Sequence, residues 1–475
     1  MKTETDNIKK AFWTGADIAA ATGGEVLCGN PLQRFSRISI DSRQLSPDDF
    51  FVAIKGATHD GHRFIVDALG HGVMGIMVHR AWADETAVTD WKDKGVVCVC
   101  VEDTTRALGD MAAFHRQRSD ASLVAITGSS GKTTTRAMTA SIVARHHETL
   151  STKGNFNNHI GLPLTLLDLC LHHRWAVVEL WMNHPGEIHR LAEICTPDIG
   201  VITNVGPSHL EGVGSIEGVM RAKAEMLNHI VPGGKAILNG DDPMVMRGAA
   251  AWKGQKICFG LSMNATIRAQ DIHHQGENVS FSLILPEETV DIHLPLPGNF
   301  MVSNALAAAT VGHVLGLSAT DIKTGLENFQ PIKGRMQIIR LKNDMRLMDD
   351  TYNANPESMA AAINTLKSLR GNQRSILVAG DMRELGESSV MHHSQIGKMS
   401  AEAGIAKLYA VGRFAEEMAR GARTGGLQNH QIFIGTQAEI IQALTDELKP
   451  GDWILVKGSR SMGMEKIVQE LGKKR

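Results

Sequence analysis

Residues 122–146 read SLVAITGSSGKTTTRAMTASIVARH, and this stretch decides the fold at the centre of the chain. An apolar run of strand length leads into a Gly/Ser turn and then into a helical segment, which is the context of a phosphate-binding loop. Glycines let backbone N–H groups approach phosphate oxygens, and the start of a helix adds positive potential. Lys132 would reach the β- and γ-phosphates, and the Thr133 hydroxyl would ligate Mg²⁺. The predicted nucleotide-binding loop consists of Gly128, Ser129, Ser130, Gly131, Lys132, Thr133 and Thr134.

The spacing of this loop is Gly-x2-Gly-Lys-Thr, which is shorter than the usual Walker pattern. An ordinary Gly/Ser turn is the alternative interpretation. Strand, glycines, lysine, hydroxyl and helix all agree with a phosphate loop, so we predict nucleotide binding. The loop alone does not fix the chemistry that is coupled to the nucleotide.

Length and composition describe an ordinary globular protein. The chain has 475 residues, of which 43% are apolar and 21% are charged. At ~100–200 residues per domain, this length predicts two to four domains. The net charge of −2 gives no global basic surface, so we expect no nucleic-acid partner.

The sequence shows no sign of export or of a membrane span. The first ten residues, MKTETDNIKK, are polar and lack the apolar core of a targeting signal. No stretch approaches the ~20 apolar residues of a membrane helix, so we expect a cytoplasmic protein without a membrane partner. The cysteines form no CxxC motif and no zinc spacing, which predicts buried, reduced thiols at Cys28, Cys98, Cys100, Cys170, Cys195 and Cys258.

Alternating strands and helices predict an α/β protein with three domains. Residues 1–102 mix short strands and helices in a small α/β domain. In residues 103–330 a helix at 104–118 precedes the phosphate loop, and strands recur at WAVVELW and IGVITNV, which favours a mostly parallel sheet. Alternation at VSFSLIL and VDIHLPL predicts an antiparallel edge on that sheet. The connector FQPIKGRMQ then leads to residues 331–475, where strands and helices alternate as in a Rossmann-like domain.

Two residues are predicted to lie near the phosphate loop because they follow strands of the same sheet. Glu179 ends WAVVELW, and His209 comes just after IGVITNV. The carboxyl ends of parallel strands form the ligand crevice of an open sheet. Glu179 is either a metal ligand or a solvated carboxylate, and His209 is either functional or structural. Lys223, on a predicted helix, reads by pattern alone as a solvated surface lysine with Glu225 nearby.

Nine segments in a fixed order resemble the Mur ligases. They are TGSSGKTTT, TKGNFNNHIGLP, VVELWMNHPGEI, NVGPSHLEG, RAKAEML, GRMQ, DDTYNANPESM, VAGDMRELG and VKGSRSMGME. The resemblance covers essentially the whole chain. It implies a first domain for the UDP end of a precursor, a central ATP-binding domain and a Rossmann-like third domain for the incoming substrate. GNFNNHIGLP and DDTYNANPESM point to the member that joins D-alanyl-D-alanine to UDP-N-acetylmuramoyl-tripeptide in peptidoglycan synthesis.

The resemblance also implies roles for single residues. The UDP end would meet Asp41, Ser42 and Arg43, and further along Lys55, Gly56, His59, Gly61 and His62. The muramoyl-peptide path would be lined by Asn155, Asn157 and Asn158. Two Mg²⁺ ions would be held, the first by Thr133 and Glu179 and the second with the help of His209. Lys223 matches a lysine that the family carboxylates on its amine, which would turn a repelling ammonium into an anionic ligand.

For the third domain the resemblance implies contacts with ATP and with the dipeptide. Asn304 of the central domain would contact adenine. From the third domain, Arg335 and Asp350 would clamp ATP, and the surrounding loop would be shaped by Tyr352, Asn353 and Asn355. The dipeptide would meet the strand and loop that contain Lys457, Ser459 and Arg460. A monomer is implied.

Three positions depart from the family pattern. Trp181 stands beside Glu179 where glycine is usual, and a large indole there would narrow the crevice or shift the turn. Phe300 and Met301 replace a pair that usually contains asparagine, which affects the expected adenine contacts. Gly463 replaces a larger residue.

The implied reaction activates a carboxylate. The γ-phosphate of ATP would pass to the terminal carboxylate of the tripeptide, and the amine of the dipeptide would attack the acyl phosphate. We find no Ser-His-Asp pattern, and no nucleophilic side chain is needed. Three alternatives are another ligase of the family that adds a single amino acid, a non-catalytic nucleotide-binding relative, and a nucleic-acid-stimulated ATPase. The scarcity of aromatic residues and the net charge disfavour the last.

Overall fold

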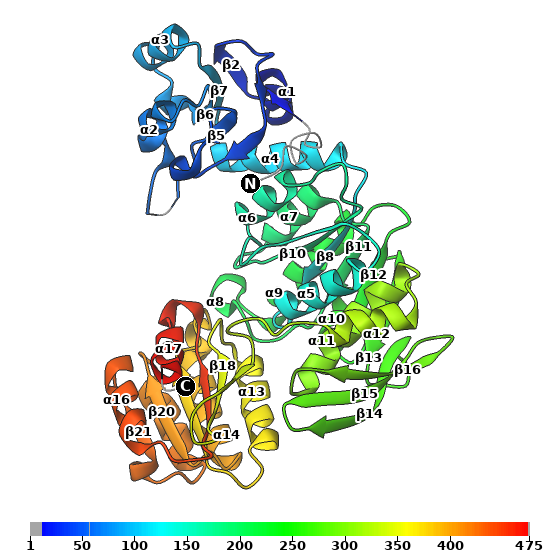
Figure 1. Ribbon diagram of the computed structural model, residues 1–475, viewed down its shortest axis with the longest axis vertical. Coiled ribbons are helices and arrows are strands. Elements are labelled where there is room, and N and C mark those ends of the chain that lie inside the picture. Colours follow the sequence, from blue (N-terminus) through cyan, green and yellow to red (C-terminus); the bar gives the residue numbers. More distant parts are fainter. Residues whose placement is uncertain (1–11, 57, 474–475) are drawn as a thin grey trace.

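A computed structural model describes residues 12–56 and 58–473, and it consists of three α/β units, each built on its own sheet. Figure 1 shows the three units along a curved path, with the middle unit between the other two. The polar segment MKTETDNIKK, in which we expected no targeting signal, lies outside the described residues. Within the described residues no helix is both long and apolar enough to cross a membrane.

The first unit carries a five-stranded sheet of order β2-β7-β6-β5-β4, parallel except for the β2–β7 pair. Its elements are β1 Trp13–Thr14, α1 Gly15–Thr22, β2 Glu25–Cys28, β3 Arg34–Phe35, β4 Arg37–Ser39, β5 Asp49–Val52, α2 Ile65–Gly70, β6 Gly75–His79, α3 Glu85–Asp93 and β7 Val97–Val101. The strand expected over FSRISIDSR is short, because Asp41 accepts a hydrogen bond from the Arg43 N–H and starts a 3-10 turn at Ser42–Gln44. This turn directs Asp41 and Arg43 away from the sheet.

The middle unit carries a nine-stranded sheet of order β16-β15-β14-β13-β12-β11-β8-β10-β9. Strands β9 to β14 are parallel to β8, and β14, β15 and β16 form the predicted antiparallel edge. The strands are β8 Ser122–Thr127, β9 Thr149–Ser151, β10 Trp175–Glu179, β11 Ile199–Ile202, β12 Lys235–Asn239, β13 Gln255–Gly260, β14 Ile267–Gln275, β15 Asn278–Ile284 and β16 Thr289–Leu294. The helices are α4 Thr104–Gln117, α5 Lys132–Val143, α6 Gly161–Leu167, α7 Glu187–Cys195, α8 Leu210–Val213, α9 Ile216–Ala224, α10 Pro243–Gly248, α11 Asn299–Val314 and α12 Ala319–Glu327.

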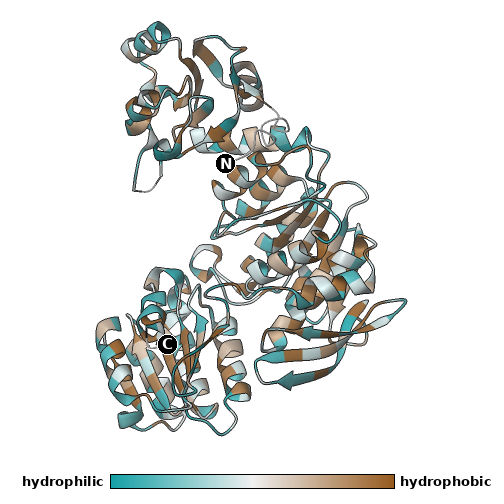
Figure 2. Cartoon of the chain, in the orientation of Figure 1, coloured by the Kyte–Doolittle hydropathy of each residue, from teal (hydrophilic) through white to brown (hydrophobic). Residues whose placement is uncertain are grey.

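Helices cover both faces of this sheet, as a parallel sheet requires. Val124 and Ile126 of β8 pack with α5, α11 and α12, whereas Leu123 and Ala125 pack with α6, α7 and α9. Figure 2 shows apolar residues concentrated on the strands and polar residues on the outer helix surfaces. The predicted helix over 104–118 is confirmed as α4, and its apolar side is buried between the first two units.

The third unit carries a six-stranded sheet of order β17-β18-β22-β19-β20-β21, parallel except for β17. Its elements are β17 Gln337–Arg340, β18 Arg346–Asp350, α13 Pro356–Leu369, β19 Ser375–Gly380, α14 Ser389–Glu402, β20 Lys407–Val411, α15 Ala415–Thr424, β21 Ile432–Ile434, α16 Gln437–Glu447, β22 Trp453–Lys457 and α17 Glu465–Gly472. The expected Rossmann-like alternation of strands and helices is therefore present.

The cysteines only partly follow the prediction. None of the six forms a disulfide, and Cys28, Cys98, Cys100 and Cys195 are buried as expected. Cys170 and Cys258 are half-exposed, so the prediction of burial is wrong for them. Cys170 lies in the segment after α6, and Cys258 lies within β13. The hydrophobic pattern at these two positions does not differ from the pattern at buried positions.

Helix α5, which follows the phosphate loop, is held from behind by a glycine contact. A side chain at Gly325 would bring its Cβ to 2.6 Å from the Ile142 Cα, and the Ser141 hydroxyl donates to the Gly325 carbonyl at 2.7 Å. The end of α12 therefore fixes the position of α5.

We predict that Gly325→Val destabilises the middle unit by about 1–3 kcal/mol, because the added side chain overpacks the α5–α12 contact. The measurement is urea unfolding followed by circular dichroism. Gly70→Ala is the matched control, since a Cβ at Gly70 meets nothing within 4 Å. An unfolding curve for Gly325→Val that overlays the parent curve would contradict this account of the packing.

Candidate active site

The phosphate loop lies at the carboxyl end of β8, between the ends of β10 and β11. Gly131 has a φ of 78°, which favours glycine, and a Cβ there would stand 2.2 Å from the Asn304 Oδ1. A Cβ at Gly128 would stand 1.8 Å from the Thr203 Oγ1. Close neighbours therefore require glycine at both positions.

Residues at the end of β11 hold the loop in shape. The Asn204 Oδ1 accepts from the Ser130 N–H at 2.8 Å, and the Thr203 hydroxyl donates to the Ser130 carbonyl at 2.7 Å. The Ser129 hydroxyl donates to the Gly206 carbonyl at 3.0 Å. Sequence reasoning missed Thr203 and Asn204, although they lie near the end of the predicted strand IGVITNV, just beyond the observed end of β11.

Glu179 is not a solvated carboxylate, because only 2% of its surface is exposed. Its Oε2 accepts from the Thr133 hydroxyl at 2.9 Å, and its Oε1 accepts from the Asn157 amide at 2.9 Å. The sheet thus brings the strand-end carboxylate directly to the loop, as the parallel topology predicted.

Half-buried cations surround this carboxylate. The Lys132 ammonium donates to the Gly128 carbonyl at 2.8 Å, and burial lowers the pKa of Lys132 while Glu179 opposes the shift. The Arg136 Nε lies 4.0 Å from Glu179, and burial lowers the pKa of Arg136. The Nε atoms of Arg136 and Arg335 are both buried without a hydrogen-bond partner. Unpaired buried donors on two cations suit an anionic ligand such as a phosphate chain.

The donors also fit Mg²⁺ bound together with a nucleotide. Among residues 12–56 and 58–473, no group of three or more His, Cys, Asp or Glu side chains forms a metal cage. Mg²⁺ usually takes only one or two carboxylates and completes its shell with phosphate oxygens and water. Glu179 and the Thr133 hydroxyl, beside the loop, supply such an incomplete set.

His209 is buried at the start of α8 and has a φ of 56°. Its Nδ1 lies 2.5 Å from the Glu384 Oε2 of the third unit, and its ring meets the Trp181 ring edge-on at 5.6 Å. Burial lowers the pKa of His209, whereas the hydrogen bond to Glu384 raises it. A neutral ring next to an ionised Glu384 agrees with the lowered pKa of that carboxyl, for which the His209 hydrogen bond is the main cause.

Lys223 is fully inside the protein, so the prediction of a surface lysine is wrong. Only 2% of its surface is exposed, on the inner side of α9. Burial lowers its pKa well below the ordinary value, Lys132 adds repulsion, and Glu357 opposes the shift. Glu225 does not pair with it but accepts from the backbone N–H groups of Gly186 and His189. The residues three and four positions away on either side of Lys223 are all apolar and buried. This helical spacing marks an inward position, and sequence reasoning missed that signal.

The third unit reaches the loop through two side chains. The Arg335 Nη2 donates to the Thr133 hydroxyl at 2.8 Å, and its guanidinium stacks on the Tyr352 ring at 3.9 Å. The Asn355 amide donates to the Ser129 carbonyl at 3.2 Å. Both contacts lie where a bound nucleotide would place its phosphates.

Other predicted third-unit residues have partners inside their own unit. Asp350 accepts from the Lys457 ammonium at 2.5 Å and from the Met336 N–H at 3.1 Å. Lys457 also donates to the Asn353 carbonyl. Ser459 is buried and donates to the Ala354 carbonyl, whereas the exposed Arg460 pairs with Glu465. These contacts describe an internal framework, in which Asp350, Lys457 and Ser459 are buried and Asn353 and Arg460 are exposed.

Asn304 and two of the three departures from the family pattern are also placed by the structure. Asn304 is buried against Gly131 and accepts from the Thr135 hydroxyl at 3.3 Å, and its amide lies 3.7 Å from the Met301 sulfur. Phe300 lies on the first turn of α11 beside Gly298. Gly463 has a φ of 62° at the end of a 3-10 turn, a conformation that suits glycine.

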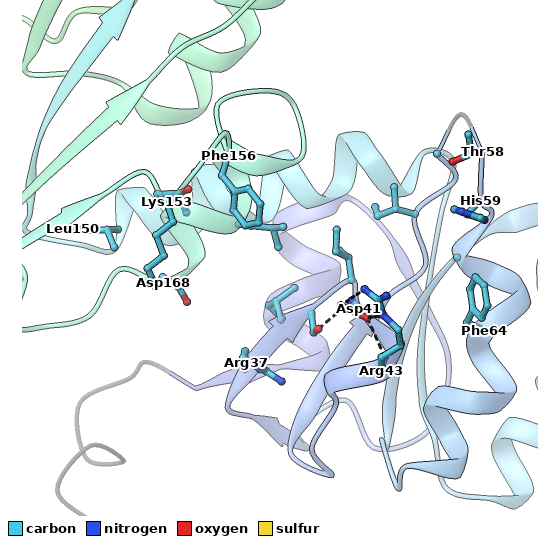
Figure 3. Close-up of a pocket in the computed structure, with 18 of the residues that line it drawn as sticks. Arg37, Asp41, Arg43, Thr58, His59, Phe64, Leu150, Lys153, Phe156 and Asp168 are labelled. Carbon is cyan, nitrogen blue, oxygen red and sulfur yellow. Dashed lines mark hydrogen bonds and ion pairs between the residues drawn. The ribbon is translucent and has the colours of Figure 1, made fainter. Parts of the chain in front are cut away.

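A second site lies between the first and middle units, where a cavity of about 810 Å³ opens (Figure 3). Among the predicted residues it is lined by Asp41, Arg43, Gly56, His59 and Gly61. Arg43 pairs with Asp41 at 2.8 Å and lowers the pKa of that carboxyl to about 2. Ser42 and Lys55 do not line it.

Two predicted residues near this cavity form hydrogen bonds within the protein. His62 is buried, with its Nδ1 2.6 Å from Asp60 and its Nε2 accepting from the His79 N–H. The Asn158 Oδ1 accepts from the N–H groups of Ile160 and Gly161, at the start of α6. Asn155 is exposed in the same loop.

Sequence reasoning missed several residues that line the cavity. They are Arg37, Phe64, Lys153, Phe156 and Asp168. Figure 3 shows Phe156 and Lys153 on the middle unit, facing Asp41 and Arg43 across the cavity. Because the two walls come from segments about a hundred residues apart, no local motif marks them.

Three family models match the sequence. They are described as "Mur ligase family, catalytic domain" over residues 34–116, "Mur ligase middle domain" over residues 126–312 and "Mur ligase, glutamate ligase domain" over residues 334–460.

Curated relatives match over nearly the whole chain. UDP-N-acetylmuramoyl-tripeptide--D-alanyl-D-alanine ligase of Escherichia coli (strain K12) is 36% identical, covering 91% of this chain and 93% of the relative. The enzyme of the same name from Bacillus subtilis (strain 168) is 32% identical, covering 91% and 92%.

Solved structures are similar over the same length. MurF from Acinetobacter baumannii has a TM-score of 0.89 at 35% identity, covering 98% of this chain and all of that chain. MurF ligase from Thermotoga maritima in complex with ADP has a TM-score of 0.81 at 26% identity, covering 92% and 97%.

We predict that Arg335→Ala weakens binding of a nucleoside triphosphate about 10- to 100-fold, because one charge-assisted hydrogen bond contributes about 1.5–3 kcal/mol. Isothermal titration with a non-hydrolysable ATP analogue and Mg²⁺ measures it. Arg340→Ala is the control, since Arg340 is exposed and pairs only with Glu277. Equal affinities in the two variants would exclude Arg335 from the nucleotide site.

Proposed function

The chain belongs to the Mur ligase family, and we propose that it joins D-alanyl-D-alanine to UDP-N-acetylmuramoyl-tripeptide. It is an ATP-dependent ligase of peptidoglycan precursor synthesis. The single observation that carries this function is the agreement between whole-chain relatives of that name and a phosphate loop whose Thr133 contacts both Glu179 and Arg335. We propose unit boundaries at residues 1–102, 103–330 and 331–475.

We assign the UDP end of the precursor to the cavity between the first two units. Arg37 and Arg43 line it and offer cations to a diphosphate, while Phe64 and Phe156 offer aromatic surface. One loop links this cavity to the phosphate loop, because Phe156 lines the cavity and Asn157 donates to Glu179. A precursor held at its UDP end would therefore extend its peptide along Asn155, Asn157 and Asn158 toward Glu179.

The reaction at the loop proceeds in two steps. An oxygen of the tripeptide carboxylate attacks the γ-phosphorus of ATP, and the bond to the β-phosphate oxygen breaks to release ADP. The dipeptide amine then attacks the acyl carbon, loses a proton, and expels phosphate as the C–O bond breaks. Lys132 and Arg335 offset the charge of the transferring phosphoryl group, and the loop N–H groups orient it.

Two Mg²⁺ ions would be held at this site, one by Thr133 and Glu179 and one by His209 together with an N6-carboxylated Lys223. Bound Mg²⁺ supplies electrostatic stabilisation of the phosphate oxygens. Carboxylation of Lys223 requires an unprotonated amine, and burial favours that form.

The third unit closes the site. We propose that the nucleotide meets Asn304, Arg335 and the loop at Tyr352, while Asp350 supports that loop through its bond to Lys457. The dipeptide would approach from the side of Ser459 and Arg460. We also propose that the protein acts as a monomer in the cytoplasm.

We predict that phosphate release requires ATP, UDP-N-acetylmuramoyl-tripeptide and D-alanyl-D-alanine together, with a product whose mass includes both alanines. Lys132→Ala should abolish turnover while circular dichroism is unchanged, because the γ-phosphoryl group loses its nearest cation. Phosphate release is followed by a coupled assay and the product by mass spectrometry. A product formed with single amino acids would favour the alternative ligase, and no product with any acceptor would favour a non-catalytic relative.

We predict that Lys223→Ala loses most activity and that a small added carboxylate such as acetate restores part of it. The cavity left by the side chain would admit an anionic oxygen ligand in place of the carbamate. Initial rates are compared with and without acetate. Lys235→Ala is the control, because Lys235 is the first residue of β12. Full activity without acetate would remove the carbamate from the proposal.

A further inference from the structure

The imidazole of His209 is held by side chains from two units of the chain. Glu384 follows β19 in the third unit and approaches the Nδ1 atom at 2.5 Å. Trp181 follows β10 in the middle unit and meets the ring at 5.6 Å with an interplanar angle of 87°. The ring is 7% exposed, so little of it remains for other contacts. Neither neighbour has a role in the function proposed above.

The segment around Glu384 is fitted to the segment around His209 through its backbone as well. The Glu211 N–H donates to the Glu384 carbonyl at 3.1 Å, and Glu384 has a φ of 64°. A Cβ at Gly386 would lie 3.5 Å from the Glu211 Cα. Non-glycine residues adopt positive φ at a cost, so both His209 and Glu384 are held in this conformation by the contact between the two units.

The contact with Glu384 decides which ring nitrogen of His209 is available. A carboxylate beside Nδ1 selects the tautomer that carries its proton there, which leaves the lone pair on Nε2. A histidine that ligates a metal commonly donates its other N–H to a carboxylate, which fixes its orientation and raises its basicity. Glu384 has this geometry, and it comes from a different unit than the histidine.

Trp181 fixes the ring from a second direction. Its backbone N–H donates to the Asn157 carbonyl at 3.0 Å, and the Asn157 amide donates to Glu179. The backbone of Trp181 is thus tied to the same loop that holds the strand-end carboxylate. The edge-to-face contact of the indole restricts rotation of the imidazole.

We propose that Glu384 and Trp181 are positioning residues that together orient His209 toward a divalent cation, so that the cation site is complete only when the third unit is docked. The inference rests on the proposed function, because it takes His209 as a cation ligand. Cation binding and docking of the third unit then favour each other, since each stabilises the same orientation of His209.

The test is a titration of the protein with Mn²⁺ in the presence of a β,γ-methylene ATP analogue, followed by electron paramagnetic resonance. Glu384→Gln should raise the dissociation constant of the second Mn²⁺ about 10- to 100-fold, the usual effect of losing such a supporting carboxylate. Trp181→Ala should give a smaller increase, and Trp181→Phe should stay close to the parent. Glu387→Gln is the matched control, because it removes an exposed carboxylate from the same loop.

A second set of variants separates positioning from stability. In a His209→Ala background, Glu384→Gln and Trp181→Ala should cause no further loss of Mn²⁺ affinity. A merely structural contact would instead lower the thermal unfolding midpoint and leave the dissociation constant unchanged, which would overturn the inference.

Failure of the inference can be distinguished from failure of the proposed function. If His209→Ala weakens Mn²⁺ binding but Glu384→Gln and Trp181→Ala do not, the positioning role is wrong and the cation role of His209 stands. If His209→Ala leaves both Mn²⁺ sites unchanged, His209 is not a ligand, and both the inference and that part of the proposed function fall.

Discussion

The parallel register of three strands is the constraint on which the site depends. Glu179 at the end of β10 pairs with Ile126 of β8, and Ile202 at the end of β11 pairs with Thr127. The three strands therefore end at one level, where the loop after β8 begins. Because of this register, the Glu179 carboxylate reaches the Thr133 hydroxyl, and Thr203 and Asn204 reach the backbone of the loop. A shift of one residue would turn these side chains to the other face of the sheet.

Charged side chains lie close together near the ends of these strands. Without a ligand, this arrangement costs free energy. Burying a cation costs free energy unless it is paired. Lys223 is buried and Arg136 is half-buried, and desolvation lowers the pKa of both. A phosphate chain with magnesium would pair with these groups. The burial that costs free energy in the protein without ligand therefore favours binding of the ligand. The third unit shares in this, because Arg335 and Glu384 both contact residues of the middle unit at the crevice.

The sequence predicted the site residues that lie at the ends of strands. It did not predict those whose position depends on burial or on contacts between residues distant in sequence. Glu179 was expected near the loop because parallel strands end together, and it lies there. Lys223 was expected on the surface because lysines are usually exposed, although the apolar residues three and four positions away place it on the inner face of its helix. The pairing of Asp350 with Lys457 joins two strands distant in sequence, and the cavity wall at Phe156 faces residues of another unit. The first pair depends on the order of the strands within one sheet, and the second contact depends on the packing of two units. Local sequence patterns reveal neither.

A structure of the protein with a non-hydrolysable ATP analogue and Mg²⁺ tests the central claim most directly. The account predicts a γ-phosphate within hydrogen-bond distance of the Lys132 ammonium and the Arg335 guanidinium, with a metal ion beside Glu179 and the Thr133 hydroxyl. Density for the triphosphate at any place away from residues 128–134 would contradict it.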